Sequence, residues 1–208
     1  MSKNWAEEQA KTIGAAVRDL RGKRPGQWLS DETERAGHRV PRTTISELES
    51  GKRKSVSTAE LCLLAWALKV PPIRLLYPDL PDGPVEIIPG KTVPSIEAAT
   101  WFAGETTYMP TMPRAKVRNA ADDPKWRAAA EEAVRVAKGA RLVELSRQRL
   151  TLEERVRTLT ALVERLKSEN PALVASFVDE ITSTQLGIES TNRELKQTDG
   201  AVVINDGE

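Results

Sequence analysis

The residues best suited to chemistry lie together in a short polar stretch, residues 40–54, which reads VPRTTISELESGKRK. On an α-helix Ile45 and Leu48 share one face, and polar side chains occupy the opposite face. These polar side chains are Arg42, Thr43, Ser46, Glu47 and Ser50. Gly51 suits the left-handed residue that ends a helix. A row of guanidinium, hydroxyl and carboxylate groups offers hydrogen bonds and ion pairs, which is the chemistry of recognition.

A basic run follows the glycine at once and is placed to meet phosphates. Arg suits guanine, Glu accepts from cytosine and the Thr methyl group contacts thymine. We therefore expect base-edge contacts from the outward residues of the helix, which are Arg42, Thr43, Ser46 and Glu47. We expect phosphate contacts, which give affinity but little sequence information, from Ser30, Ser50, Lys52, Arg53 and Lys54.

Short amphipathic helices surround this stretch. Upstream, Ile13, Val17 and Leu20 recur at helical spacing. Ser30 is expected to cap a second helix, which stops near Gly37. Downstream, an apolar helix is expected after Ser57, with Glu60 at the capping-box position, and a fifth short helix after Pro71 and Pro72. The pattern predicts five short helices in about 75 residues.

Residues 7–78 resemble the lambda-repressor-like (XRE) helix-turn-helix regulators. The residues that carry the resemblance are Arg21, Gly37, Thr44, Ile45, Ser46, Leu48, Glu49, Gly51, Lys52, Arg53, Leu61, Ala65, Leu68, Lys69 and Val70. The resemblance implies an all-α, five-helix DNA-binding domain, in which Arg21 and Glu49 form a structural ion pair between the first and third helices. The chain departs from the family after Gly37, where the connection is about two residues longer than usual and Pro41 stands at the common Ser/Thr cap position.

Composition limits the alternatives. Residues 1–76 carry 14 Lys and Arg against 9 Asp and Glu, a net charge of +5, whereas residues 77–208 carry 17 against 21, a net charge of −4. A basic N-terminal part fits DNA binding. With one histidine and one cysteine, Cys62, we expect no metal site, no disulfide and no cofactor, and a cytoplasmic location. We expect Cys62 to be a core thiol and the tryptophans to be mostly core residues.

The chain is expected to divide into four parts. Residues 1–78 form the DNA-binding domain, and residues 79–123 a Pro/Gly-containing linker with a short strand, a short helix packed back on the domain and a flexible stretch at 104–124. Residues 124–186 form a helical oligomerisation region, and residues 187–208 a disordered tail. No run of about 18 apolar residues is present, so we expect no membrane span.

A heptad pattern runs through the long helix expected from Pro124 to Glu169. The d positions are Leu145, Leu152, Leu159 and Leu166, and the a positions are Leu142, Arg149, Val156 and Val163. Leu at d with β-branched residues at a favours a parallel two-stranded coiled coil, so we predict a homodimer through these residues. The alternative is an intramolecular hairpin with the amphipathic helix of residues 172–186.

These features predict a bacterial or phage transcriptional regulator, repressor-like, that binds double-stranded DNA and uses no catalytic residues. An antitoxin that covers a toxin with its C-terminal helices and represses its own operon is a second hypothesis. A protein-interaction adaptor whose helix-turn-helix has lost DNA binding is a third. An enzyme is the weakest hypothesis, because no convergent acid, base or nucleophile appears in the sequence.

Overall fold

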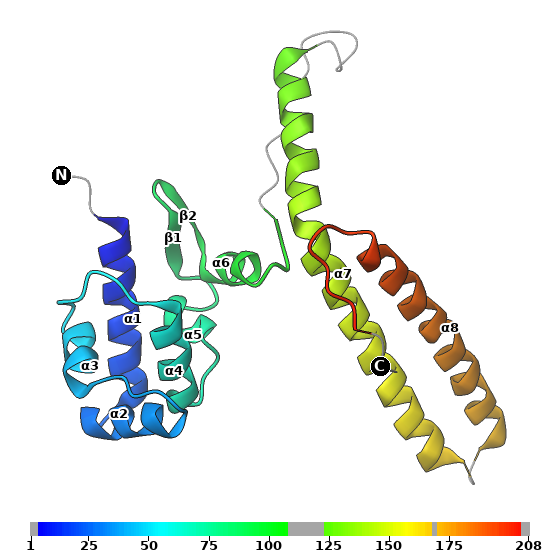
Figure 1. Ribbon diagram of the computed structural model, residues 1–208, viewed down its shortest axis with the longest axis horizontal. Helices are drawn as coiled ribbons and strands as arrows, with labels where there is room; N and C mark the ends of the chain where they lie inside the picture. Colours follow the sequence, from blue (N-terminus) through cyan, green and yellow to red (C-terminus); the bar gives the residue numbers. More distant parts are fainter. Residues whose placement is uncertain (1–3, 108–122, 168–169, 205–208) are drawn as a thin grey trace. The chain divides into compact units, whose positions relative to one another are not determined.

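The computed structural model describes residues 4–107, 123–167 and 170–204, and the chain divides into two units, residues 1–103 and 104–208. The described part is mostly helical (Figure 1). Its elements are α1 (Trp5–Arg21), α2 (Gly26–Arg35), α3 (Arg42–Glu49), α4 (Thr58–Leu68), α5 (Ile73–Leu76), β1 (Pro84–Ile88), β2 (Lys91–Pro94), α6 (Ser95–Phe102), α7 (Pro124–Leu166) and α8 (Pro171–Lys196).

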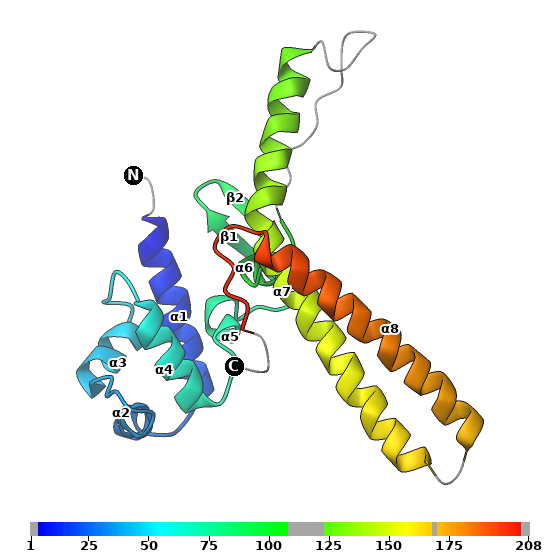
Figure 2. The same ribbon diagram turned by 45° about the vertical axis from the view of Figure 1, so that its right-hand side comes forward.

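The core of the first unit lies between α1 and the four helices that follow it, and α1 runs through the middle of the group in both views (Figures 1 and 2). Each of the five helices contributes an almost fully buried side chain. These are Val17, Leu29, Ile45, Leu64 and Leu75, none more than 1% exposed. Because every helix must bury one apolar stripe, this shared core sets the position of α3.

The capping box expected at the start of α4 is confirmed. Ser57 Oγ accepts from the backbone N–H of Glu60, and the Glu60 carboxylate accepts from the backbone N–H of Ser57. Two expectations for this helix are wrong, because Cys62 is exposed and Trp66 is 67% exposed. The apolar stripe of Leu61, Leu64, Ala65 and Leu68 does face the core, whereas Cys62 and Trp66 lie on the other side of the helix.

A small antiparallel β-hairpin and α6 complete the first unit. Strand β1 pairs with β2, with Val85 opposite Val93. The indole N–H of Trp5, on α1, donates to the carbonyl of Glu86 at 2.8 Å. The rings of Tyr77 and Phe102 meet edge to face, with centroids 6.3 Å apart. These contacts join residues 79–103 to the helices, so the domain expected to end at residue 78 extends further.

The second unit is built on α7, which starts at Pro124 as expected. Helix α8 packs antiparallel along the C-terminal part of α7 (Figures 1 and 2). Guanidinium–carboxylate pairs mark the register, from Arg141 to Glu194 and from Arg155 to Glu180, each with an Nε–Oε1 distance of 3.0 Å. The hairpin alternative of the sequence therefore describes this chain, and it extends past residue 186.

The heptad residues of α7 face α8. Leu145 and Leu159 are 1% and 2% exposed, and on α8 Leu195 is 3% exposed. A Cβ placed on Gly187 would lie 3.5 Å from Leu152 Cδ1, an ordinary van der Waals distance, so Leu152 faces α8 at this position. The remaining heptad residues, Leu142, Arg149, Val156, Val163 and Leu166, are half-buried. The predicted seam thus has an intrachain partner.

The expectations for the linker and the tail have different outcomes. Most of the stretch at 104–124 lies outside the described residues. The tail expected from residue 187 is wrong at its start, because α8 continues to Lys196 and buries Thr191 and Leu195 near its C-terminal end. That end of the helix is polar in sequence but still meets α7. Within the described ranges, no helix is both long enough and apolar enough to cross a membrane.

Candidate nucleic-acid interface

Helix α3 has the two faces that its sequence predicts. Ile45 and Leu48 are 1% and 2% exposed and point into the core. The opposite, exposed face carries the predicted base-contacting residues and the residue that follows the helix, which are Arg42, Thr43, Ser46, Glu47 and Ser50. All five side chains lie on one continuous surface because their spacing follows the helical period. This surface, residues 42, 43, 46, 47 and 50, is called the polar face below.

Helix α3 crosses α1 with its backbone almost in contact. A Cβ placed on Gly14 would lie 2.1 Å from the Leu48 carbonyl oxygen, a distance that real side chains do not reach. Any other residue at position 14 would push α3 away from α1. Gly14 therefore fixes how deeply α3 sits in the domain, and hence how far the polar face projects.

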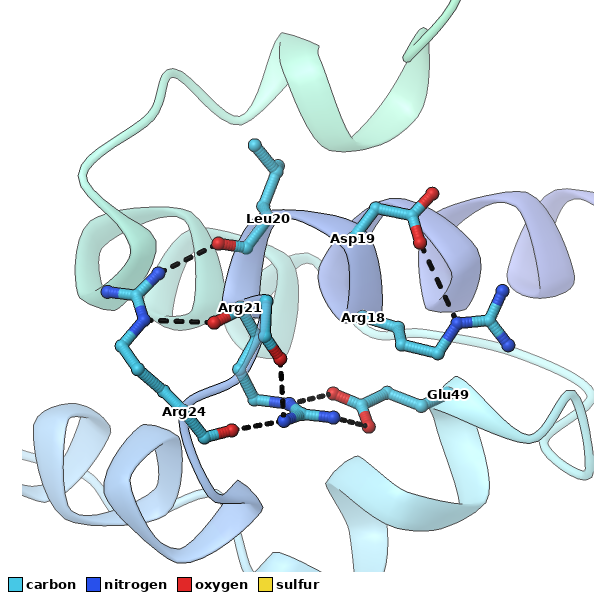
Figure 3. Close-up of polar contacts among 7 residues, drawn as sticks. Arg18, Asp19, Leu20, Arg21, Arg24 and Glu49 are labelled. Carbon is cyan, nitrogen blue, oxygen red and sulfur yellow. Dashed lines mark hydrogen bonds and ion pairs between the residues drawn. The ribbon is translucent and has the colours of Figure 1, made fainter.

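The ion pair implied by the family resemblance is present between α1 and α3. Arg21 Nε and Nη2 donate to the two carboxylate oxygens of Glu49, both at 2.7 Å, and the side chains are 16% and 11% exposed (Figure 3). The hydrogen bond with Glu49 raises the pKa of Arg21, more than offsetting the effect of its burial. A bidentate, shielded pair fixes orientation as well as distance, so it locks the end of α3 onto α1.

The same guanidinium also organises the chain between α1 and α2. Arg21 Nη1 donates to the carbonyls of Gly22 and Arg24 (Figure 3). Arg24 Nη2 donates in turn to the Leu20 carbonyl at 2.7 Å, and its guanidinium stacks 3.9 Å above the ring of Trp28 on α2. One hydrogen-bonded group therefore joins α1, the start of α2 and the end of α3.

The first residues of α2 and α3 are neighbours. A Cβ placed on Gly26 would lie 3.8 Å from Arg42 Cγ. Both helices thus begin near the same part of the surface, and helix N-termini carry partial positive charge. A long cation at position 42 and two helix N-termini make this end of the polar face attractive to an anion.

The basic loop after α3 divides into two kinds of residue. Lys52 is exposed, and Lys54 is 84% exposed with its ammonium 3.6 Å from a Glu7 carboxylate oxygen. Arg53 is only 26% exposed and pairs with Glu60, the capping residue of α4. This ion pair makes Arg53 less available to phosphate than the two exposed lysines, and the phosphate contact expected of Arg53 stays a prediction.

The two roles expected of Ser30 are wrong. It was expected to cap α2 and to contact phosphate, but α2 begins at Gly26, with Pro25 at the N-cap position. Ser30 is 1% exposed, and its Oγ has no hydrogen-bond partner among the described residues. The sequence signal failed because a serine followed by acidic residues is typical of a helix start, and here it stands inside a longer helix.

Lys11 is a cation that sequence reasoning missed. It belongs to α1, yet a Cβ placed on Gly51 would lie 3.4 Å from Lys11 Cγ, so its side chain lies against the loop after α3. Its ammonium is 2.9 Å from a Glu8 carboxylate oxygen, and that hydrogen bond raises the pKa of Lys11. No local pattern indicates this proximity, because Lys11 and Gly51 lie 40 positions apart in the chain.

The arrangement places exposed hydrogen-bonding groups on α3, with Arg42 at its N-terminal end and Lys52 and Lys54 after its C-terminal end. It offers recognition of a polyanion with an irregular pattern of donors and acceptors. No group of His, Cys, Asp and Glu in the described ranges could hold a metal ion. Comparisons with protein-family models, with curated proteins and with solved structures found no match.

Proposed function

We propose that the chain is a sequence-specific regulator of transcription, repressor-like, that binds double-stranded DNA with α3 in the major groove. The single observation that carries the proposal is the polar face of α3, exposed along its whole length while the opposite face is buried. An α-helix fits the major groove, where each base pair presents a distinct pattern of donors and acceptors. The lambda-repressor-like resemblance of residues 7–78 points to the same use of this helix.

The proposed contacts are of two kinds, those to base edges and those to phosphates. Arg42 and Glu47 suit guanine and cytosine respectively, and Thr43 and Ser46 complete the set that faces base edges. Ser50, at the end of the polar face, and Lys52 and Lys54, just beyond it, are assigned to phosphates. The ion pair of Arg21 with Glu49 and the close crossing at Gly14 hold α3 rigidly. A recognition helix that is already held in place loses little conformational entropy on binding, which favours affinity.

A homodimer through the heptad residues of the second unit is part of the proposal. In the single chain, the seam of α7 is covered by α8. A coiled-coil dimer through residues 142–166 therefore requires α8 to leave α7. A dimer of a different kind forms if two chains exchange their α8 helices, and the seam of each α7 then packs on the partner's α8. Either arrangement would tether two DNA-binding units, which raises the effective concentration of the second unit after the first has bound.

The test is selection of duplexes from a random pool by the full chain. We expect an enriched motif, and we expect Arg42→Ala to weaken binding to it by about 1–3 kcal/mol while relaxing preference at one or two base pairs. Arg135→Ala is the matched control, because this exposed arginine belongs to α7, pairs with Glu132 and lies outside the first unit. Failure of the wild-type chain to retain any duplex contradicts the proposal and favours the adaptor hypothesis.

A further inference from the structure

The connection between α2 and α3 is held by one buried hydroxyl group. Residues 36–41 join the two helices. Thr33, on α2, is completely buried, and its Oγ1 accepts from the backbone N–H of Val40 at 2.9 Å. The same hydroxyl donates to the Ser30 carbonyl at 2.8 Å, so it is used both as acceptor and as donor. Val40 is 2% exposed, so the bond is shielded from water.

Thr33 also binds the connection through its backbone. Its carbonyl accepts from the N–H of Ala36 at 3.1 Å and from the N–H of His38 at 3.3 Å. Gly37 has a φ of 103°, a left-handed conformation that glycine adopts without strain. The connection thus turns at Gly37 and returns to Thr33 at Val40, two residues before α3 begins.

The start of α3 has no side-chain cap of its own. Pro41 stands at the N-cap position and has no hydroxyl or amide to satisfy the first N–H groups of the helix. The anchor nearest to the first residue, Arg42, is therefore the bond between Thr33 and Val40. This hydrogen bond, called the Thr33–Val40 clamp below, ties the N-terminal end of α3 to α2.

We propose that Thr33 is a positioning residue for base recognition: through the clamp it sets the angle at which α3 presents Arg42 and Thr43, without touching the ligand itself. The inference rests on the proposed function. Loss of the hydroxyl leaves a buried N–H at Val40 without a partner, and the connection then relaxes until water reaches it. Base-edge hydrogen bonds depend on angle, whereas contacts to phosphate tolerate small movements.

The test compares the full chain with Thr33→Val, which keeps the shape and removes the hydroxyl, and with Thr33→Ser, which restores it. Duplex selection is followed by affinity measurements on the selected and the scrambled sequences. We expect Thr33→Val to lose at least about fivefold discrimination at the base pairs read by Arg42. Binding to scrambled DNA should stay within about twofold, because phosphate contacts carry it. Thr33→Ser should recover the discrimination.

The outcomes separate the inference from the function on which it rests. Absence of any motif for the wild-type chain overturns both. A wild-type motif that Thr33→Val retains unchanged overturns the inference alone. If Thr33→Val does not fold, amide exchange in the wild-type chain tests the clamp. Amide exchange gives an independent readout: the Val40 N–H should exchange as slowly as the core helices, and rapid exchange overturns the clamp.

Discussion

Arg21 and Glu49 lie 28 residues apart and form a bidentate ion pair that joins the end of α1 to the end of α3. Both side chains are largely shielded from water. Removal of either partner leaves a shielded charge without its hydrogen bonds, and such losses are larger than those at exposed pairs. The pair is therefore a stability element of the first unit and, through α3, of the candidate interface.

The first prediction follows from this pair. Glu49→Ala should lower the free energy of unfolding of the first unit by about 2 kcal/mol. Arg18→Ala is the control, because Arg18 meets Asp19 at 3.7 Å with both side chains well exposed (Figure 3), and should cost less than about 1 kcal/mol. Urea titration followed by tryptophan fluorescence measures both. Equal losses in the two variants would show that the shielded pair has no special weight.

The second prediction concerns the crossing of α1 and α3. Gly14→Ala should destabilise the first unit by about 1–3 kcal/mol, because the added methyl group meets the Leu48 carbonyl and forces the helices apart. Gly139→Ala is the matched control: it lies inside α7 with no atom within 4 Å of its added Cβ. Helix propensity predicts a gain of roughly 0.5–1 kcal/mol there. Thermal unfolding of the two variants should shift in opposite directions.

The third prediction separates the cations of the loop after α3. Lys52→Ala with Lys54→Ala should flatten the dependence of DNA affinity on salt by up to about 1.8 log units, at about 0.9 per lost phosphate contact. Arg53→Ala should leave that slope unchanged and lower stability instead, because Arg53 supports Glu60 at the start of α4. Affinity measured across a salt series decides. A weaker dependence of DNA affinity on salt for Arg53→Ala would show that Arg53 contacts phosphate.

The fourth prediction is a pH dependence at the start of α4. Burial raises the pKa of Glu60, but hydrogen bonds from Ser57 and Arg53 outweigh it and hold the pKa below its ordinary value of 4.5. A lowered folded-state pKa means that the carboxylate stabilises the protein above pH 4.5 and loses that effect as the pH falls through the folded value. Glu60→Gln should therefore be less stable than wild type at pH 7. The gap should close in acid, and a gap that persists there would assign the effect to packing.

The fifth prediction concerns assembly. Leu145→Asp with Leu159→Asp buries charge in the seam of α7, so the second unit should lose helical content while the first unit stays folded. Leu150→Asp, on the same helix but 60% exposed, is the control and should change little. Sedimentation of the wild-type chain at micromolar concentrations should give a dimer under the proposal. A monomer would assign the seam to α8 of the same chain alone.

Local patterns were enough to predict much of the fold and part of the candidate site. The two faces of α3 follow from the helical period of residues 42–50, and the Ser57–Glu60 capping box follows from a spacing of three residues. Interactions of this range involve only neighbours in the chain, so the residue types largely determine them. The long helix α7 and its apolar stripe could be predicted from the sequence for the same reason.

Tertiary structure decided which of several possible partners each side chain meets. Ser30 is of a residue type that often caps helices, but it is buried inside α2. Arg53 has the charge to bind phosphate, but in the structure it pairs with Glu60. The apolar stripe of α7 had to be covered, and the sequence did not state by which chain; in the structure α8 of the same chain covers Leu145 and Leu159. Periodicity determines that a surface is buried, whereas its partner depends on packing between segments distant in the chain.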